Sequence, residues 1–400
     1  MKKFLFGKAG AMAASKKYNR FDNYLLKGKL RRKGFEWWRY VFTGINRATG
    51  EQKAFFVELY YVNPLISPKK AIIAQKSQLK ISDSDLQYAL AGTLAASKAN
   101  EEEEFIPSYA LLKAGFYGEN GRQFNCFYPS EKLNFIKSDQ SFKLENCIFG
   151  KDLISGSIEV TEENLSEKPE LLCSAGTMKW NLHFEKTIES APLYKNKNDL
   201  WIPLGAKTVF AGVVELNGTE YTVVPRSSAG YISKSWGEKL IENYFHLSST
   251  NFTSSISGKN LGKSCFCIEG EFEKKLKAFV ELEGRKISLS GKGIFNKYSE
   301  IHSCSQMPID ADGEKLHWSV SVHWKKYVID VDVYCRTSQM LIKNYELLEG
   351  GRDLIEICSG GTGFGEIKIF KKIRKNLELL EHATIFDVIC DFGSVDSAEA

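Results

Sequence analysis

The stretch KGFEWWRYVF, Lys33 to Phe42, places two tryptophans beside a glutamate and an arginine. If this stretch is a β-strand, successive side chains point to opposite faces. The side chains then form two sets, with Phe35, Trp37, Arg39 and Val41 on one face and Glu36, Trp38, Tyr40 and Phe42 on the other. Both sets are too aromatic for a strand that exposes one side to water. We predict that one face packs in a core and that the other lines a cavity holding a carboxylate.

The composition of the whole chain is that of a globular β-protein. Its 400 residues are 43% hydrophobic, 26% charged and 12% aromatic, with only nine prolines. This composition favours β-structure with extensive packing between rings. The length predicts two domains. No run of about 18 apolar residues occurs, so we expect no membrane-spanning helix.

Positive charge is concentrated at the start of the chain. Residues 1–33 contain eleven Lys and Arg against one Asp, a net charge of +10, whereas the whole chain carries +5, so the remainder carries −5. This distribution argues against a nucleic-acid-binding protein, whose positive charge should follow a folded face. Two interpretations of the leader remain: a solvated terminus, or electrostatic attachment to anionic lipid. The leader also resembles a secretory signal, but Lys8 interrupts its short apolar core.

The cysteines and histidines predict neither disulfides nor a metal site. Nine cysteines are an odd number without any C-x-x-C, which is typical of reduced, mostly buried thiols in a cytoplasmic protein. His317 and His323 would lie too far apart on one strand to share an ion. We therefore predict no metal and no cofactor. The predicted location is cytoplasmic, with peripheral contact to the inner membrane surface through residues 1–33 as the second option.

Strand signals dominate the remaining sequence. FFVELYYVN, KTVFAGVVELNGTEYTVV and LHWSVSVHW alternate or form short apolar runs between turn residues. Asn217 and Gly218 predict a tight hairpin because both tolerate positive φ, and ELEGRKI predicts a second one. Strands that follow one another without helices between them predict an all-β, mainly antiparallel fold of two barrels or sandwiches with a few short helices.

Helical signal is confined to ISDSDLQYALAGTLAASKANEEEE (81–104) and SWGEKLIENYF (235–245). A domain boundary falls near PRSSAG (225–230). The predicted organisation is a basic leader at 1–20, an N-terminal barrel at 21–228 with an insertion at about 72–105, and a C-terminal barrel at 229–400.

Common catalytic motifs are absent or incomplete. SGGTGFGEIKIFKK (359–372) imitates the glycine-rich loop of a protein kinase, and DFG occurs at Asp391–Gly393, but no catalytic loop lies between them. A dinucleotide site would need a helix after the glycines, where a strand is expected. No G-x-S-x-G elbow supports a serine hydrolase. We interpret 359–372 as a glycine-rich strand connection.

Tryptophans accompanied by polar residues are the distinctive feature of the chain. Glu36 and Trp38 share one strand face, and GYISKSWGEKL brings Tyr231, Lys234 and Trp236 together. Each of these is more often core packing than chemistry. The remaining candidates for a deep aromatic pocket are Tyr40, Tyr60, Trp180, His183 and Trp318. Such pockets bind greasy, flat or polyene-like ligands.

Several of these motifs resemble the tocopherol cyclase family. GFEWWRY is similar to that family's F-E-x-W-Y strand, and YYVNP (60–64) to the run that follows it. WNLHF, FAGVVELNGTEYTV, GYISKSWGEK and the closing GTGFGEIKIF…ELLEHATIFDVICDFG continue the resemblance in the same order. The likeness is patchy but collinear over roughly 35–393. Arg39 departs from the family's tyrosine, and 72–104 has no counterpart.

This resemblance implies two lipocalin-like barrels that act on isoprenoid or polyketide substrates, an architecture also associated with carotenoid hydratases and cofactor-free cyclases. It implies Glu36 as a general acid, with Tyr231 and Lys234 orienting a substrate oxygen and Trp38, Trp180 and Trp236 facing a developing cation. Glu36 has a structural alternative as a buried pair with Arg39 or a neighbouring lysine. The predicted function is acid-catalysed cyclisation or hydration of a lipophilic substrate; the alternative is a non-catalytic lipid or pigment carrier.

Overall fold

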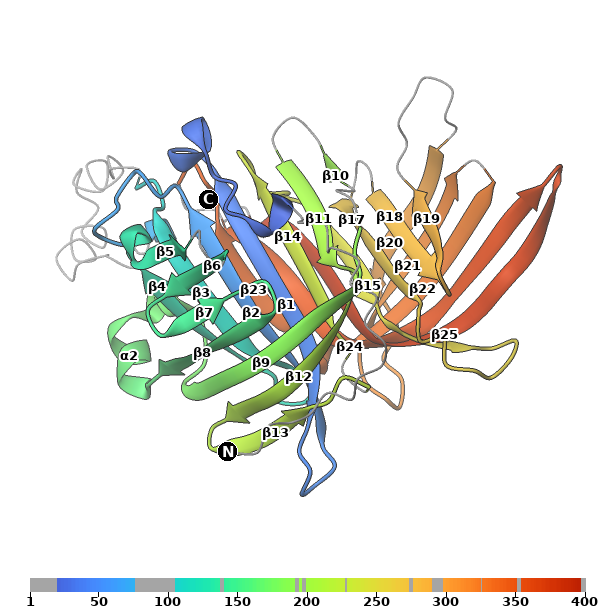
Figure 1. The fold of residues 1–400 in the computed structure, drawn as a ribbon, viewed down its shortest axis with the longest axis horizontal. Coiled ribbons are helices and arrows are strands. Elements are labelled where there is room, and N and C mark those ends of the chain that lie inside the picture. The colour runs from blue at the N-terminus through green and yellow to red at the C-terminus, as the bar shows by residue number, and fades with distance from the viewer. Residues whose placement is uncertain are drawn as a thin grey trace, which may run out of the picture.

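The computed structural model describes residues 20–75, 105–136, 140–190, 194–195, 199–226, 229–272, 276–289, 298–324, 326–350 and 354–396. The predicted leader (except residue 20), the predicted helix at 81–104 and most of the insertion at about 72–105 lie outside these residues. The described chain is all-β and antiparallel, as the strand pattern predicts, and its strands form two curved sheets that face each other (Figure 1).

The first sheet is built from fourteen strands in the order β10-β11-β14-β1-β13-β12-β9-β8-β7-β6-β5, with β2, β3 and β4 continuing from β1. Its strands are β1 (Phe35–Ile45), β2 (Gln52–Val62), β3 (Tyr109–Tyr117), β4 (Arg122–Tyr128), β5 (Leu133–Ile136), β6 (Ser141–Leu144), β7 (Cys147–Phe149), β8 (Leu153–Val160), β9 (Gly176–Ile188), β10 (Tyr194–Lys195), β11 (Asp199–Gly205), β12 (Lys207–Leu216), β13 (Thr219–Val223) and β14 (Tyr231–Gly237).

The second sheet has eleven strands in the order β19-β18-β17-β15-β25-β24-β22-β21-β20, with β16 paired to β25 and β23 to β24. Its strands are β15 (Tyr244–Ser249), β16 (Asn251–Ser254), β17 (Cys265–Glu271), β18 (Leu276–Leu282), β19 (Arg285–Leu289), β20 (Tyr298–Gln306), β21 (Lys315–Trp324), β22 (Tyr327–Arg336), β23 (Leu341–Glu346), β24 (Leu354–Ile373) and β25 (Asn376–Asp396).

Among the described residues, helices are few and short. The α-helix α2 (Glu162–Glu167) begins at a capping box in which Thr161 and Asn164 satisfy each other's backbone N–H groups. The 3₁₀ turns are Arg20–Asp22, Gly28–Arg31, Ser130–Lys132, Pro169–Leu171 and Thr337–Gln339. No helix in the described part of the chain is long and apolar enough to cross a membrane.

Both predicted hairpins form. Asn217 and Gly218, with φ of 48° and 79°, connect β12 to β13, and Glu283 and Gly284, with φ of 44° and 89°, connect β18 to β19. Consecutive residues with positive φ match the right-handed twist of the flanking strands. The glycine-rich segment at 359–372 lies within the long strand β24 rather than between strands.

The chain passes from the first sheet to the second at a different place than the sequence predicts. The strand β14 follows the expected boundary at 228/229, yet it pairs with β1 and β11 of the first sheet. The change of sheet takes place in 238–243, between β14 and β15. The helix predicted at 235–245 is wrong, because this segment leaves one strand and enters another, and it inserts Leu240 and Ile241 between the sheets.

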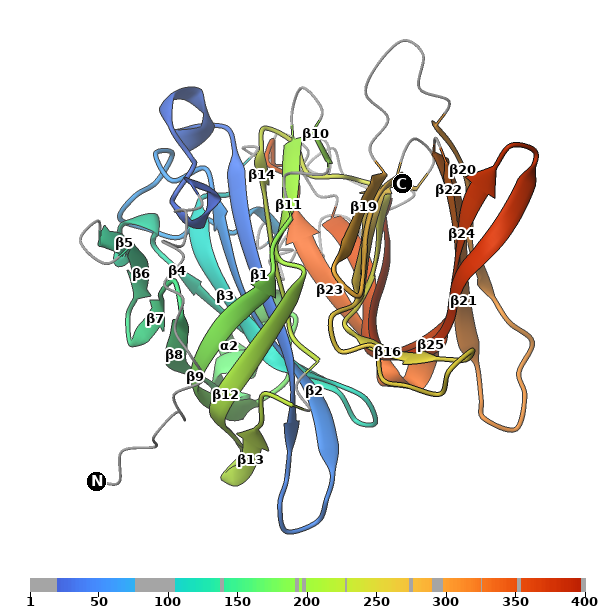
Figure 2. The same ribbon diagram turned by 45° about the vertical axis from the view of Figure 1, so that its right-hand side comes forward.

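Three apolar layers hold the fold together, and Figure 2 shows the two sheets that they join. The first core lies on the concave side of the first sheet and includes Trp38, Tyr40 and Phe42. The second core lies within the second sheet and includes Trp318. Between the sheets lies a third layer, the inter-sheet layer, which contains Phe35, Trp37, Phe56, Tyr60, Tyr231, Tyr244 and Tyr345.

Candidate functional site between the two sheets

The strand β1 separates two environments, as its sequence predicts. Trp38 and Tyr40 point into the first core, whereas Phe35, Trp37 and Val41 belong to the inter-sheet layer. Every residue from Phe35 to Gly44 is buried, because β1 pairs with β2 and β14 and both of its faces are covered. The strand is therefore central to both cores, and a polar side chain on either face needs a buried partner.

Glu36 is fully buried in an ion pair with Lys234, whose Nζ lies 2.5 Å from Glu36 Oε1. The backbone N–H groups of Leu25 and Leu26 also donate to the Glu36 carboxylate, at 3.0 and 3.2 Å. Burial raises the pKa of Glu36, an effect that Lys234 partly offsets. Burial likewise lowers the pKa of Lys234, and Glu36 offsets that shift.

Glu36 is therefore in the buried ion pair that the sequence offers as the alternative to a catalytic role, and its partner is the lysine rather than Arg39. Lys234 also donates to the carbonyl oxygens of Phe21 and Asn23, and its Nζ lies 4.7 Å from the centre of the Trp38 ring. The pair thus holds residues 21–26 against β1 and β14 of the first sheet. Glu36 lines neither of the two cavities described below.

A cavity inside the first core is lined by Trp38, Tyr40, Phe142, Phe149 and Phe184, with the ion pair of Asp22 and Lys186 at its edge. Only about 20 Å³ of this space can hold the centre of a water molecule. Trp38 and Tyr40, which the sequence predicts to line a pocket, therefore do border a cavity. This cavity has room for little more than one water molecule.

A second cavity lies between the sheets. Its walls are Phe35, Trp37, Ser235, Leu240, Ile241, Tyr244, Glu269, Tyr345, Ile355 and Ile357. The volume in which the centre of a water molecule fits is about 10 Å³, whereas the total empty volume, which includes open solvent, is about 320 Å³. Leu240 and Ile241 are the lining residues that do not belong to a strand. Segment 238–243 therefore forms the part of the wall that is not held by a sheet.

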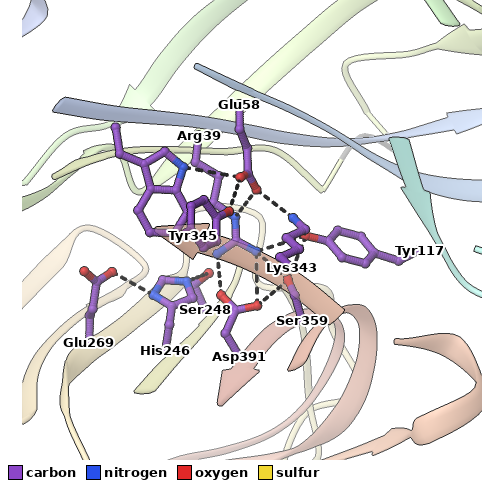
Figure 3. A network of polar contacts seen from close by, with 11 residues as sticks. Arg39, Glu58, Tyr117, His246, Ser248, Glu269, Lys343, Tyr345, Ser359 and Asp391 are labelled. Carbon is purple, nitrogen blue, oxygen red and sulfur yellow. Dashed lines mark hydrogen bonds and ion pairs between the residues drawn. The ribbon is translucent and has the colours of Figure 1, made fainter. Parts of the chain in front are cut away.

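A buried ionic network lies beside this cavity and joins the two sheets (Figure 3). On the first sheet, Arg39 and Glu58 are neighbours across β1 and β2, with Arg39 Nε 3.5 Å from Glu58 Oε1. From the second sheet, Asp391 pairs with Arg39, and Lys343 Nζ lies 2.6 Å from Glu58 Oε1. Each of these four side chains is at least 96% buried.

Glu58 positions two walls of the inter-sheet cavity. The Tyr345 hydroxyl donates to Glu58 Oε2 at 2.7 Å, and the Trp37 indole N–H donates to the same oxygen at 3.3 Å. Burial alone would raise the pKa of Glu58, but Lys343, Arg39 and Lys113 outweigh it and lower the pKa to about 2. Glu58 is therefore ionised at neutral pH and accepts from both rings that face the cavity.

Lys113 lies at the margin of this network. Its Nζ donates to the backbone oxygen of Asn344 at 2.8 Å and lies 3.9 Å from the centre of the Tyr345 ring. Burial lowers its pKa to about 7, although Glu58 acts in the opposite direction. The network therefore contains one group whose charge changes near neutral pH.

Three side chains of the second sheet form a chain of hydrogen bonds that ends at the cavity. His246 Nδ1 lies 3.1 Å from Glu269 Oε2, and His246 Nε2 lies 2.9 Å from Ser248 Oγ. Burial lowers the pKa of His246 to about 3, so the imidazole is neutral at neutral pH. A neutral ring that donates from Nδ1 to Glu269 and accepts from the Ser248 hydroxyl satisfies both contacts.

This Ser–His–Glu arrangement is similar in geometry to a hydrolytic triad. However, the cavity reaches the chain of bonds at Glu269, whereas neither Ser248 nor His246 lines it. Ser248 is fully buried. A substrate in the cavity would therefore meet the carboxyl group, and the arrangement supports proton transfer at Glu269 rather than nucleophilic attack by Ser248.

The residues predicted to form one pocket are distributed over several places. Trp38, Tyr40, Trp180 and Trp236 lie in the first core, and Trp318 lies in the second. Tyr60 and Tyr231 belong to the inter-sheet layer, where Tyr60 packs against Trp37 and Tyr345 and Tyr231 lies 5.4 Å from His246 between ring centres. His183 is exposed, because the alternation of β9 directs Leu182 and Phe184 inward. Of this set, Trp38 and Tyr40 line the cavity inside the first core, and none of the others lines either of the two cavities described above.

The sequence contains a signal for the residues that prediction missed. Glu58 and Lys113 are single charges inside the apolar strand segments FFVELYYV and YALLKAGFY, and no other charged residue lies on either face of these segments. Both strands are buried over almost their whole length. A lone charge in such a run indicates a buried partner, although not which one. Within the described residues, no group of three His, Cys, Asp or Glu side chains is placed to hold a metal ion.

Comparison with known proteins leaves the family of this chain open. No protein-family model and no curated protein matches it. Among solved structures it is similar to a protein provisionally named AttH from Nitrosomonas europaea, with 8% identity over 96% of this chain and 98% of the other and a TM-score of 0.43. It is also similar to kievitone hydratase from Nectria haematococca, with 10% identity, 97% and 96% coverage and a TM-score of 0.43. At this level of similarity, the function has to be argued from the chain's own residues.

Proposed function

We propose that this chain binds an isoprenoid or similarly lipophilic molecule between its two sheets and promotes its cyclisation or hydration by acid–base catalysis, without a cofactor. The observation that carries the proposal is the position of Glu269. Its carboxyl group lines an otherwise largely apolar cavity and is held from behind by His246. Enzymes place acid–base groups in such surroundings.

The chemistry fits the groups at the cavity. Cyclisation and hydration of an alkene each add one proton and release one, so no electrons need to be exchanged. Glu269 would transfer the proton at the substrate carbon. Trp37, Tyr244 and Tyr345 present ring faces or edges to the same space, and desolvated π faces stabilise a nearby cation by roughly 2 kcal/mol. This assignment places the acid at Glu269 instead of Glu36, whose carboxylate is occupied by Lys234 and two backbone N–H groups.

Substrate entry requires the cavity to enlarge. Pockets for small molecules usually enclose about 300–1,000 Å³, whereas water centres have about 10 Å³ here. Leu240 and Ile241 are the lining residues outside the strands, and they are only 8% and 9% exposed. Displacement of segment 238–243 would open the cavity without separating any pair of strands. We therefore place the entrance at this segment.

The experiment combines ligand identification with one matched pair of variants. Purified protein is exposed to a lipid extract and re-isolated, its bound molecules are identified by organic extraction and mass spectrometry, and their conversion is followed over time. Glu269→Gln should retain the ligand but lose at least about 100-fold in turnover, the usual scale of general acid–base catalysis. Glu271→Gln, two residues further along the same strand and outside the cavity wall, should retain both.

The outcomes separate catalysis from carriage. A ligand that is bound and released unchanged by both the original protein and Glu269→Gln would favour the non-catalytic carrier, which the largely apolar lining also suits. Full turnover in Glu269→Gln would refute the assignment of the acid. Failure to recover any lipophilic molecule, together with no binding of an environment-sensitive fluorophore, would refute both functions. Labelling of Ser248 by a fluorophosphonate would show that the nucleophile, not the carboxyl group, is accessible.

A further inference from the structure

The hairpin that joins β24 to β25 ends in a basic tip. Lys371, Lys372, Arg374 and Lys375 lie within five consecutive positions, and Arg374 occupies the turn with φ of 58°. Figures 1 and 2 show this hairpin projecting at the outer end of the second sheet, away from the first sheet. Within the described residues none of the four has an ion-pair partner at 4 Å or less, so their charge is directed to the surroundings.

Apolar side chains are exposed on the same tip. Ile373, Leu377 and Leu379 are 45%, 50% and 44% exposed. A single exposed leucine is ordinary on a protein surface. Residues 371–379 instead combine three large aliphatic side chains with four cations. This combination suits the interface of an anionic bilayer, where apolar groups enter the headgroup region and cations remain at the phosphates.

The neighbouring turn adds aromatic and basic groups at the same end. The backbone N–H of Lys372 donates to the carbonyl of Lys326 at 2.7 Å, and Tyr327 is the cross-strand partner of Lys371. Lys326 is exposed, while Tyr327 and Trp324 are partly exposed. Tyrosine and tryptophan are enriched where proteins meet the membrane–water interface. The one acidic residue among 371–379 is Glu378.

We propose that the β24–β25 tip, defined as residues 371–379, docks the chain on an anionic lipid surface. The charge of the tip selects the occupant: an apolar protein partner would gain little from four unpaired cations, whereas an anionic lipid surface uses both the cations and the aliphatic groups. This contact is distinct from the one predicted for residues 1–33, and it does not depend on the function proposed for the inter-sheet cavity.

Co-sedimentation of the full-length chain with vesicles tests the proposal. Vesicles of phosphatidylcholine with 30% phosphatidylglycerol are compared with pure phosphatidylcholine, at low and at high salt. Each basic residue near an anionic surface contributes a factor of about five in affinity. Lys372→Gln combined with Lys375→Gln should therefore weaken binding about thirty-fold. Leu377→Ser combined with Leu379→Ser should also weaken binding, and less salt-dependently.

A matched control removes the same charge elsewhere. Lys69 and Lys70 are adjacent exposed lysines after β2, and Lys69→Gln with Lys70→Gln should leave vesicle binding unchanged. The proposal is overturned if the tip variants bind as the original chain does, which would assign any membrane contact to residues 1–33. It is also overturned if the full-length chain binds neither vesicle, or if it binds heparin but not anionic vesicles. Circular dichroism of the variants verifies that the sheets remain folded.

Discussion

Glu58 joins the two sheets through several buried contacts. Its carboxylate receives Lys343 at 2.6 Å and Tyr345 at 2.7 Å from the second sheet, and Trp37 at 3.3 Å from its own sheet. Glu58→Gln keeps the shape of the side chain but removes its charge. Lys343 then remains buried without its anion, because its other polar partner is the neutral hydroxyl of Tyr117.

Two estimates of the cost agree. Removing one partner of a buried ion pair destabilises a protein by about 3–5 kcal/mol. Independently, lowering the pKa of Glu58 from 4.5 to about 2 corresponds to about 3 kcal/mol at 1.36 kcal/mol per pH unit. Since the pKa is lower in the folded state, this contribution is present above pH 4.5 and is lost as the pH falls toward 2. We therefore expect Glu58→Gln to cost about 3 kcal/mol at pH 7, and less as the solution is acidified.

Urea unfolding followed by tryptophan fluorescence measures this effect. The control is Glu215→Gln, which removes the anion of an exposed pair with Lys179 at 2.9 Å and should barely move the urea midpoint. The assay is run at pH 7 and at several values down to the lowest at which both proteins fold. Equal midpoints for Glu58→Gln and Glu215→Gln at pH 7 would refute the reasoning. So would a loss of stability that does not change with pH.

Two further predictions test other buried positions. Burial raises the pKa of Glu346 to about 7, so the free energy of unfolding should fall by up to about 3 kcal/mol as the pH rises from 4.5 through 7. Glu346→Gln should flatten this pH dependence in thermal unfolding between pH 5 and 8. A pH dependence that is the same in the variant would contradict the prediction. At Gly360 an added Cβ would lie 2.9 Å from the sulfur atoms of both Cys335 and Cys390, so Gly360→Ala should cost about 1–3 kcal/mol. The control is Gly262→Ala, where the nearest atom to an added Cβ is Asn260 Oδ1 at 3.8 Å and little change is expected. Equal melting temperatures of the two variants would contradict the crowding.

The local pattern of the sequence is enough to predict the strands and their faces. The alternation in FEWWRYVF divides β1 between the first core and the inter-sheet layer, although the carboxylate of Glu36 lines neither cavity. Asn217-Gly218 forms its hairpin because the turn needs two residues with positive φ and needs nothing from the rest of the chain. The faces of a strand and the conformation of a tight turn depend on neighbouring residues, so the sequence alone is enough to predict them.

The site could not be predicted in the same way, because its partners are distant in the chain. Arg39 and Asp391 are separated by 352 positions, and Glu58 and Lys343 by 285. The residue type of an aromatic side chain does not distinguish a ring in a filled core from one that borders a cavity. Trp180 and Trp318 both pack in cores, and among the described residues neither indole N–H has a hydrogen-bond partner. The more informative signal was the isolated charge within an apolar strand.

The same energies indicate how the inter-sheet cavity can open. Separating the sheets would break the pairs of Glu58 with Lys343 and of Arg39 with Asp391, each at about 3–5 kcal/mol if one partner is left buried. Moving segment 238–243 exposes Leu240 and Ile241, at about 1.5–3 kcal/mol each. The second route is cheaper and leaves Trp37 and Tyr345 fixed by Glu58. On the proposed route of entry, the ionic network would keep the Trp37 and Tyr345 walls in place while segment 238–243 is displaced.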